Sequence, residues 1–236
     1  PADPRVVLQQ VLARYTKLGL TPVVASEMEF HLLEIDRDQF GRPQHTQRAL
    51  DGSPALGGAT YGIEAMRKIA PLMDAISSTA GQQNLPVDTL ISEFGASQCE
   101  INLHYQDCAL RACDQASMLR RAIRAVAQQQ GKQASFMAKP FADDVGNGMH
   151  IHFSLLDSSG VNVFDNGAAE GSELLQYAVA GCLENMADCI AIFAPNINSY
   201  RRLVPGCYAP TAPTWGYENR TTALRIPAGN GDARRI

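Results

Sequence analysis

The first informative stretch of this chain is residues 23–33, which read VVASEMEFHLL. In a β-strand, residues two apart share a face. Apolar side chains occupy the even positions 24, 28, 30 and 32, whereas Glu27, Glu29 and His31 occupy odd positions. The pattern predicts a strand with one face on the core and two neighbouring carboxylates on the other. Like charges this close repel unless they are solvated, protonated or bridged by a cation, so both a solvent-facing strand edge and a cation site are open.

Further strands and helices are predicted around this stretch from alternation, helical spacing and turn residues. The predicted strands, which form two antiparallel pairs, are 87–93 with 99–104 and 148–156 with 161–164. The predicted helices are 4–18, 71–83, 108–130 and 173–194, with Asp3, Asp107 and Ser172 as N-caps. Residues 36–62 are expected to form a long loop. Because helices and strands do not alternate strictly, the fold class is α+β with an antiparallel sheet rather than a doubly wound parallel sheet.

Composition limits the functional classes. The chain has 236 residues, of which 45% are hydrophobic and 19% charged, and these values exclude a disordered or fibrous protein. The net charge of −4 argues against nucleic-acid binding, which needs clustered positive charge. No apolar run approaches the ~18 residues that a membrane span needs, and the first residues do not resemble a signal peptide. We therefore expect a cytoplasmic protein with neither nucleic-acid nor membrane partners, whose six cysteines are reduced thiols.

Two further stretches carry residue types that ligate metals. Glu93 ends one predicted strand and Glu100 begins the next, so the tight connection between them can bring the two carboxylates together. His150 and His152 share a face of the 148–156 strand, and the glycines before them let the backbone approach a ligand closely. Taken one at a time, these stretches are also compatible with surface glutamates and with structural histidines.

Taken together, the acidic and histidine residues suggest one site. Carboxylates with a histidine are hard ligands that suit Mg²⁺ or Mn²⁺ better than Zn²⁺. More carboxylates than one ion requires suggest two ions, which is the arrangement that clamps a transferring phosphate. The candidate ligands are Glu27, Glu29, Glu93, Glu100 and His150.

Arginines are concentrated in the last 36 residues, where they interrupt apolar segments punctuated by proline. They are Arg201, Arg202, Arg220, Arg225, Arg234 and Arg235. Guanidinium groups bind phosphate and carboxylate oxygens in pairs, so arginines opposite an acidic metal site would suit phosphoryl transfer. Solvent-facing arginines, or pairs with acids of the chain, are the alternative. The sequence has no P-loop and no G-x-G-x-x-G motif, so on the residues alone a metal-dependent phosphohydrolase is the competing hypothesis.

Five motifs, in order along essentially the whole chain, resemble the glutamine synthetase family. They are residues 27–29 (EME), Glu93 with Glu100, 146–152 (GNGMHIH), 198–206 (NSYRRLVPG) and 219–227 (NRTTALRIP). The chain is most similar to the γ-glutamylpolyamine (γ-glutamylputrescine) synthetase branch, through residues 86–91 (PVDTLI), 136–140 (FMAKP) and 194–198 (APNIN). The resemblance implies a glutamine-synthetase-type catalytic domain over residues 1–236, with a mainly antiparallel curved sheet flanked by helices.

The resemblance also implies a role for each matched residue. Glu29, Glu93 and Glu100 would hold one ion, and Glu27 with His150 a second ion that bridges nucleotide phosphates. Arg220 and Arg225 would be the catalytic residues that steady the phosphates. The substrate glutamate would be bound by Gly146, Arg202 and Arg220. The nucleotide would be bound by Asp88, His152, Ser154, Arg225 and Arg235.

The implied reaction has two steps and uses ATP as co-substrate with two or more Mg²⁺ or Mn²⁺ ions. ATP phosphorylates the γ-carboxylate of L-glutamate, and an amine then attacks the resulting acyl phosphate and expels phosphate. Family members that form glutamine carry a glutamate in a P-G-x-E-A-P segment, where it binds and deprotonates ammonium. Here residues 205–210 read PGCYAP, and Tyr208 favours a bulkier amine such as putrescine. Ordinary glutamine synthetase and a non-catalytic relative are the alternatives.

The resemblance further implies that the chain is the middle of a longer protein. In the family, a glutamate directly after the position of Ile236 completes the second metal site, and an N-terminal β-grasp domain contributes to the active site of the neighbouring subunit. The family forms two stacked hexameric rings, so the full-length parent is expected to be a homo-oligomeric dodecamer. The isolated segment is expected to be inactive, and ATP- and glutamate-dependent phosphate release from it would contradict this.

Overall fold

The computed structural model describes residues 3–46 and 62–236. Their contacts divide the chain into two compact units. The first comprises Pro1–Ala25, Tyr105–Cys113 and Ile151–Ile236, and the second comprises Ser26–His104 and Asp114–His150. Among the described helices, none combines the length and the apolar composition needed to cross a bilayer.

The second unit is built on an antiparallel sheet with the order β2-β3-β1-β4. Its strands are β1 (Thr21–Glu34), β2 (Val87–Ser92), β3 (Gln98–Leu103) and β4 (Lys132–Ser135), and β5 (Met149–Leu156) pairs with β1 off this path. In the β1–β3 register, Glu29 lies opposite Glu100 and His31 opposite Gln98. The antiparallel pairing therefore gathers polar side chains from segments about 70 residues apart on one face of the sheet.

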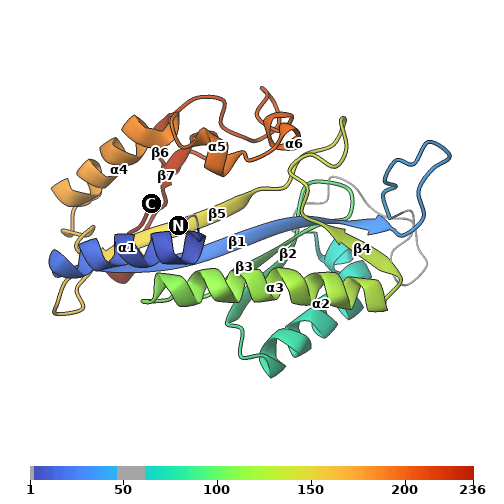
Figure 1. The fold of residues 1–236 in the computed structure, drawn as a ribbon, viewed down its shortest axis with the longest axis horizontal. Coiled ribbons are helices and arrows are strands. Elements are labelled where there is room, and N and C mark those ends of the chain that lie inside the picture. The colour runs from blue at the N-terminus through green and yellow to red at the C-terminus, as the bar shows by residue number, and fades with distance from the viewer. Residues whose placement is uncertain (1–2, 47–61) are drawn as a thin grey trace. The chain divides into compact units, whose positions relative to one another are not determined.

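The opposite face of this sheet packs on helices α2 (Ile63–Gln82) and α3 (Ala109–Gln129) (Figure 1). The alternation predicted for residues 23–33 is confirmed here, because Met28, Phe30 and Leu32 are at most 3% exposed. They belong to one apolar cluster with Leu72 and Ile76 of α2 and with Leu119 and Ile123 of α3. The part of β1 that carries Glu27 and Glu29 is not a sheet edge, because it pairs with β3 and the chain at the start of β5 also pairs with it.

The first unit has a smaller core, in which Leu155, Phe164, Leu175, Val179 and Ile226 are buried together. Its helices are α1 (Pro4–Lys17), α4 (Glu173–Met186), α5 (Ile190–Phe193), α6 (Ile197–Tyr200) and the 3-10 turn Gly231–Ala233. The predicted N-caps are confirmed for α1 and α4, where Asp3 accepts from Arg5 N–H and Ser172 from Leu175 N–H. The short strands β6 (Trp215–Tyr217) and β7 (Leu224–Ile226) pair in parallel, which the sequence did not indicate.

Several predicted elements are wrong in extent. Helix α2 begins at Ile63 and runs through Pro71, because an apolar stripe that includes Leu72 and Ile76 packs on the sheet and outweighs the hydrogen bond that proline removes. The predicted strand 161–164 reduces to one bridge between Leu156 and Asn162.

Boundaries were also misplaced at other helices. Helix α3 begins at Ala109, so Asp107 is not the residue next to its start. Helix α4 ends at Met186 rather than near 194, and α5 follows it as a separate turn. Strand β4 was not predicted, and most of the predicted loop 36–62 lies outside the described residues.

Candidate active site

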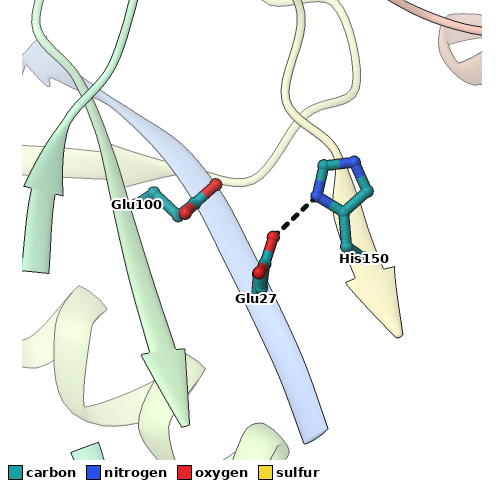
Figure 2. Close-up of side chains that lie close together, drawn as sticks. All are labelled: Glu27, Glu100 and His150. Carbon is teal, nitrogen blue, oxygen red and sulfur yellow. Dashed lines mark hydrogen bonds and ion pairs between the residues drawn. The ribbon is translucent and has the colours of Figure 1, made fainter. Parts of the chain in front are cut away.

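Three of the predicted ligands converge in the second unit (Figure 2). Glu27 on β1, Glu100 on β3 and His150 on β5 each offer a ligand atom, and these atoms lie within 4.8 Å of one another. His150 Nδ1 is 2.9 Å from a carboxylate oxygen of Glu27, and Glu100 is only 6% exposed. Ligand atoms on opposite sides of a Mg²⁺ ion are about 4 Å apart, so the group has the dimensions of a site for one divalent cation.

The charge balance of this group also suits a cation. Burial raises the pKa of Glu100 to about 7, and the nearby carboxylates of Glu27, Glu29 and Glu93 act in the same direction. The pKa of His150 is raised by its hydrogen bond with Glu27, against the effect of burial. One buried and three partly buried carboxylates that repel one another are a fit for Mg²⁺ or Mn²⁺, which would supply the missing positive charge.

The other two predicted ligands border this group without belonging to it. Glu29 Oε2 accepts hydrogen bonds from Gly148 N–H at 2.8 Å and from Gln98 Nε2 at 3.1 Å. Glu93 follows the end of β2, and one of its oxygens accepts from Phe94 N–H at 3.2 Å. The division into a Glu29–Glu93–Glu100 site and a Glu27–His150 site stays a prediction. The group found in the structure takes Glu100 from the first of these sites and Glu27 with His150 from the second.

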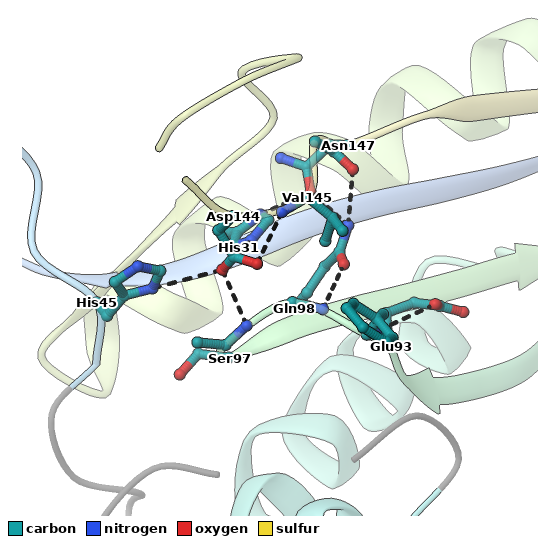
Figure 3. A network of polar contacts seen from close by, with 12 residues as sticks. His31, His45, Glu93, Ser97, Gln98, Asp144, Val145 and Asn147 are labelled. Carbon is teal, nitrogen blue, oxygen red and sulfur yellow. Dashed lines mark hydrogen bonds and ion pairs between the residues drawn. The ribbon is translucent and has the colours of Figure 1, made fainter. Parts of the chain in front are cut away.

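Figure 3 shows a polar network that the sequence analysis missed. This network lies beside Glu29, to which Gln98 donates a hydrogen bond. It contains His31, which is fully buried, together with Gln98, Asn147 and Asp144. A signal was present, because His31 shares the polar face of β1 with Glu27 and Glu29. Burial of that face, however, depends on the neighbouring strands and on the loop at 138–148.

Asp144 anchors one end of this network. Its Oδ1 accepts from Val145 N–H at 2.7 Å and its Oδ2 from Ala96 N–H at 3.0 Å, with His31 Nε2 at 3.6 Å. Burial favours a higher pKa for Asp144, but the nearby His31 ring and the hydrogen bonds from Val145 and Ala96 N–H lower the pKa below its usual value. The folded protein therefore favours the ionised carboxylate.

We expect Asp144→Asn to lower the free energy of unfolding at pH 7 by about 1–3 kcal/mol, because one of two partly buried acceptor oxygens is replaced by a donor. A carboxylate with a lowered folded pKa stabilises the protein above its unfolded pKa, and this stability is lost as the pH falls through the folded pKa. The difference from wild type should therefore shrink below about pH 4, as urea unfolding at a series of pH values would measure.

Asp38→Asn is the matched control for this prediction. Asp38 accepts from Phe40 and Arg42 N–H through Oδ1 alone, and an asparagine keeps that acceptor. A loss as large in Asp38→Asn as in Asp144→Asn would contradict the importance of the second oxygen.

The predicted nucleotide-binding residues of the first unit lie partly together. Arg235 Nε donates to His152 Nδ1 at 3.1 Å, and Ser154 lies two residues further along the same face of β5. Reciprocal backbone hydrogen bonds of 3.0 Å between Phe153 and Ile236 align the last residues with β5. The structure thus brings His152 and Arg235 into contact across 83 residues of sequence.

The remaining predicted residues occupy separate places. Asp88 lies on β2, with Oδ1 3.6 Å from His104 Nε2, and the Gly146 carbonyl accepts from Gln98 Nε2 at 3.0 Å. Arg225 lies on β7, Arg202 follows α6, and Arg220 lies in the turn between β6 and β7. These arginines belong to the first unit and the acidic group to the second, so their convergence stays a prediction.

Comparisons with known proteins place these residues in a family. All 236 residues match the family model described as glutamine synthetase, catalytic domain. Gamma-glutamylputrescine synthetase PuuA of Escherichia coli is 39% identical over 234 residues, covering 99% of the chain and 50% of that protein. Gamma-glutamylethanolamide synthetase GlnA4 of Streptomyces coelicolor is 33% identical, covering 100% and 49%. Glutamine synthetase of Pyrococcus horikoshii is 34% identical, covering 100% and 50%. The chain therefore spans about half the length of these curated relatives.

Solved structures agree with this assignment. A GmaS/ADP complex superposes with a TM-score of 0.84 at 28% identity, covering 99% of the chain and 53% of that protein. Plasmodium falciparum glutamine synthetase has the same fold, with a TM-score of 0.79 at 20% identity, covering 94% and 47%. These structures confirm the predicted α+β fold of the glutamine synthetase type. Together with the match of the whole chain to the catalytic-domain model, they show that this chain belongs to the glutamine synthetase family.

Proposed function

We propose that the protein carrying this chain is an ATP-dependent ligase that joins the γ-carboxylate of L-glutamate to an amine. The observation that carries the proposal is the convergence of Glu27, Glu100 and His150, with Glu29 and Glu93 beside them, in a chain of this family. In a non-catalytic scaffold, nothing would offset the cost of placing the buried Glu100 beside other carboxylates that repel it. A cation that binds both the carboxylates and the phosphates of a substrate would explain why the carboxylates lie close together.

Each proposed role follows from the chemistry of the side chain. Mg²⁺ or Mn²⁺, in two or more sites, would neutralise phosphate charge on ATP. The proposed ligands are Glu27, Glu29, Glu93, Glu100 and His150. The Gly146 carbonyl and Arg202 would orient glutamate, through its amino and carboxylate groups respectively.

The reaction itself is proposed to proceed through an acyl phosphate. The γ-carboxylate of glutamate attacks the γ-phosphorus of ATP and releases ADP. The amine nitrogen then attacks the acyl carbonyl, loses a proton, and expels phosphate. Arg220 and Arg225 would stabilise the negative charge that develops on the transferred phosphoryl group. The nucleotide would be held by Asp88, His152, Ser154, Arg225 and Arg235.

The proposed nucleophile is a polyamine such as putrescine rather than ammonia. Tyr208 stands where glutamine-forming relatives are expected to carry a glutamate, and the side chain is 70% exposed. A phenol cannot serve as the anion that binds ammonium at neutral pH. The 39% identity with a γ-glutamylputrescine synthetase supports the same choice.

Initial rates of phosphate release from ATP would test both steps in the full-length protein, with glutamate and putrescine, ethanolamine or ammonia. We expect release to depend on glutamate and to be fastest with putrescine. Glu27→Gln should abolish it, whereas Glu34→Gln, on the same strand but paired with Lys132, should retain it. Preferential use of ammonia would overturn the choice of amine and favour glutamine synthetase, an activity named for the Pyrococcus relative.

Metal binding distinguishes the proposed enzyme from a non-catalytic relative. Glu93→Ala should weaken Mn²⁺ binding, and an unchanged affinity would contradict the role of Glu93 as a ligand.

The proposal includes a cytoplasmic homo-oligomer of two hexameric rings for the full-length parent. Sedimentation of that protein tests the dodecamer, which a monomer or dimer would contradict.

A further inference from the structure

Three buried polar side chains, called here the His31–Gln98–Asn147 cluster, are hydrogen-bonded to one another, and one of them, Gln98, donates to an oxygen of Glu29. His31 lies two residues after Glu29 on the same face of β1, and Gln98 lies opposite it in register on β3. Asn147 comes from the loop that leads into β5 (Figure 3). The three residues are 0%, 3% and 7% exposed, so their hydrogen bonds compete with little water.

The hydrogen atoms in this cluster can be assigned from its geometry. Asn147 Nδ2 donates to the carbonyls of Ser135 at 3.2 Å and Met137 at 2.8 Å. Asn147 Oδ1 is therefore the acceptor for His31 Nδ1 at 2.8 Å and for Gln98 Nε2 at 3.2 Å. His31 must carry a proton on Nδ1, and the orientation of the Asn147 amide is determined.

The orientation of Gln98 is determined in the same way. Its Oε1 accepts from Gly95 N–H at 2.9 Å, while its Nε2 faces three oxygens. These are Glu29 Oε2 at 3.1 Å, the Gly146 carbonyl at 3.0 Å and Asn147 Oδ1. A flipped amide would direct its oxygen at three acceptors and its nitrogen at a donor, so the amide has one favourable orientation.

Glu29 Oε2 thus receives two donors, Gln98 Nε2 and Gly148 N–H. Both bonds go to the same oxygen, which restrains the carboxylate and directs Oε1 away from these donors. We propose that Gln98 is a positioning residue that orients Glu29 to bind a divalent cation through Oε1, and that His31 and Asn147 maintain Gln98 in that role. The proposal rests on the proposed function, in which Glu29 is a metal ligand.

The same amide also contacts the proposed glutamate site, because Gln98 Nε2 reaches the Gly146 carbonyl. One buried side chain therefore connects a proposed metal ligand to a proposed substrate-binding carbonyl. Residues that orient a ligand in this way affect metal affinity by about 10- to 100-fold when they are replaced.

Mn²⁺ titration followed by electron paramagnetic resonance tests the role of Gln98 in the full-length protein. Gln98→Met is close in size and removes both donors. We expect it to weaken Mn²⁺ binding by about tenfold or more. In a Glu29→Ala background the same substitution should change the affinity less than about twofold, because the carboxylate through which Gln98 acts is gone.

Thr46→Val is the matched control. Thr46 is buried and donates to the Leu32 carbonyl of β1 at 3.0 Å, so its loss also weakens the support of this strand. It is expected to lower the melting temperature and leave Mn²⁺ affinity unchanged. If Gln98→Met does not fold, Gln98→Asn is the second variant to test. Its shorter side-chain amide cannot reach both Gly95 and Glu29, so we expect the same loss of Mn²⁺ affinity.

The outcomes separate the two proposals. If the wild type does not bind Mn²⁺, or Glu29→Ala binds it as the wild type does, the proposed metal site is wrong. If Glu29→Ala weakens binding but the Gln98 variant does not, the positioning role is wrong. Equal losses from the Gln98 variant in both backgrounds would also overturn it, because a merely structural role does not depend on Glu29.

Discussion

Glu100→Gln is expected to stabilise the metal-free protein and to abolish its response to Mn²⁺. Glu100 is 6% exposed, and burial together with the charges of Glu27, Glu29 and Glu93 raises its pKa from 4.5 to about 7. Above pH 7 the folded protein must keep this carboxylate ionised among other carboxylates. Glutamine keeps the size of the side chain without the charge. The free-energy cost of ionising residue 100 therefore disappears, and the proposed carboxylate ligand of the cation is lost.

The pH dependence of this effect has a definite sign. When the folded pKa is raised, the wild type loses stability as the pH rises from the unfolded pKa near 4.5 to the folded pKa near 7. The advantage of Glu100→Gln should therefore be near zero below pH 4.5 and reach its full value above pH 7. A shift of this size corresponds to at most about 3 kcal/mol. Urea unfolding with a chelator present measures it.

Glu34→Gln provides the control for Glu100→Gln. Glu34 lies on β1 and pairs with Lys132 Nζ at 2.9 Å, so its replacement should slightly destabilise the protein and preserve the Mn²⁺ effect. Adding Mn²⁺ should raise the melting temperature of the wild type and of Glu34→Gln, but not of Glu100→Gln. A metal-free Glu100→Gln protein less stable than the wild type at pH 8 would contradict the inferred repulsion.

Phe30→Ala is expected to cause the largest loss of stability, about 3–5 kcal/mol. Phe30 is fully buried, packs on Phe136 with ring centroids 5.4 Å apart, and lies between Glu29 and His31 in the sequence of β1. Its truncation leaves a cavity between the sheet and the helices that cover it. Chemical unfolding in urea measures the loss directly.

Phe40→Ala is the matched control for Phe30→Ala. Phe40 is 69% exposed and contacts the Arg42 guanidinium at 5.0 Å from the ring centroid. We expect its truncation to cost less than about 1 kcal/mol. Similar losses in the two variants would contradict the assignment of Phe30 to the central core.

Local patterns in the sequence were sufficient for several features of the structure. Apolar alternation identified β1, and the capping residues Asp3 and Ser172 marked the starts of α1 and α4. These features depend on neighbours within a few residues, so they can be read without knowledge of the fold. Proline at position 71 misled the same kind of reasoning, because the packing of α2 on the sheet is not visible in its local sequence.

The chain order of motifs was enough to indicate the family and to select the acidic residues and His150 as candidate metal ligands, a role that stays a prediction. The grouping of Glu27, Glu100 and His150 came from the antiparallel pairing of β3 with β1 and from the pairing of β5 with β1. The His31–Gln98–Asn147 cluster depended on tertiary structure to a greater degree, since Asn147 is 116 residues from His31. Local pattern determines which way a side chain faces, but its partners and its burial depend on segments distant in the sequence.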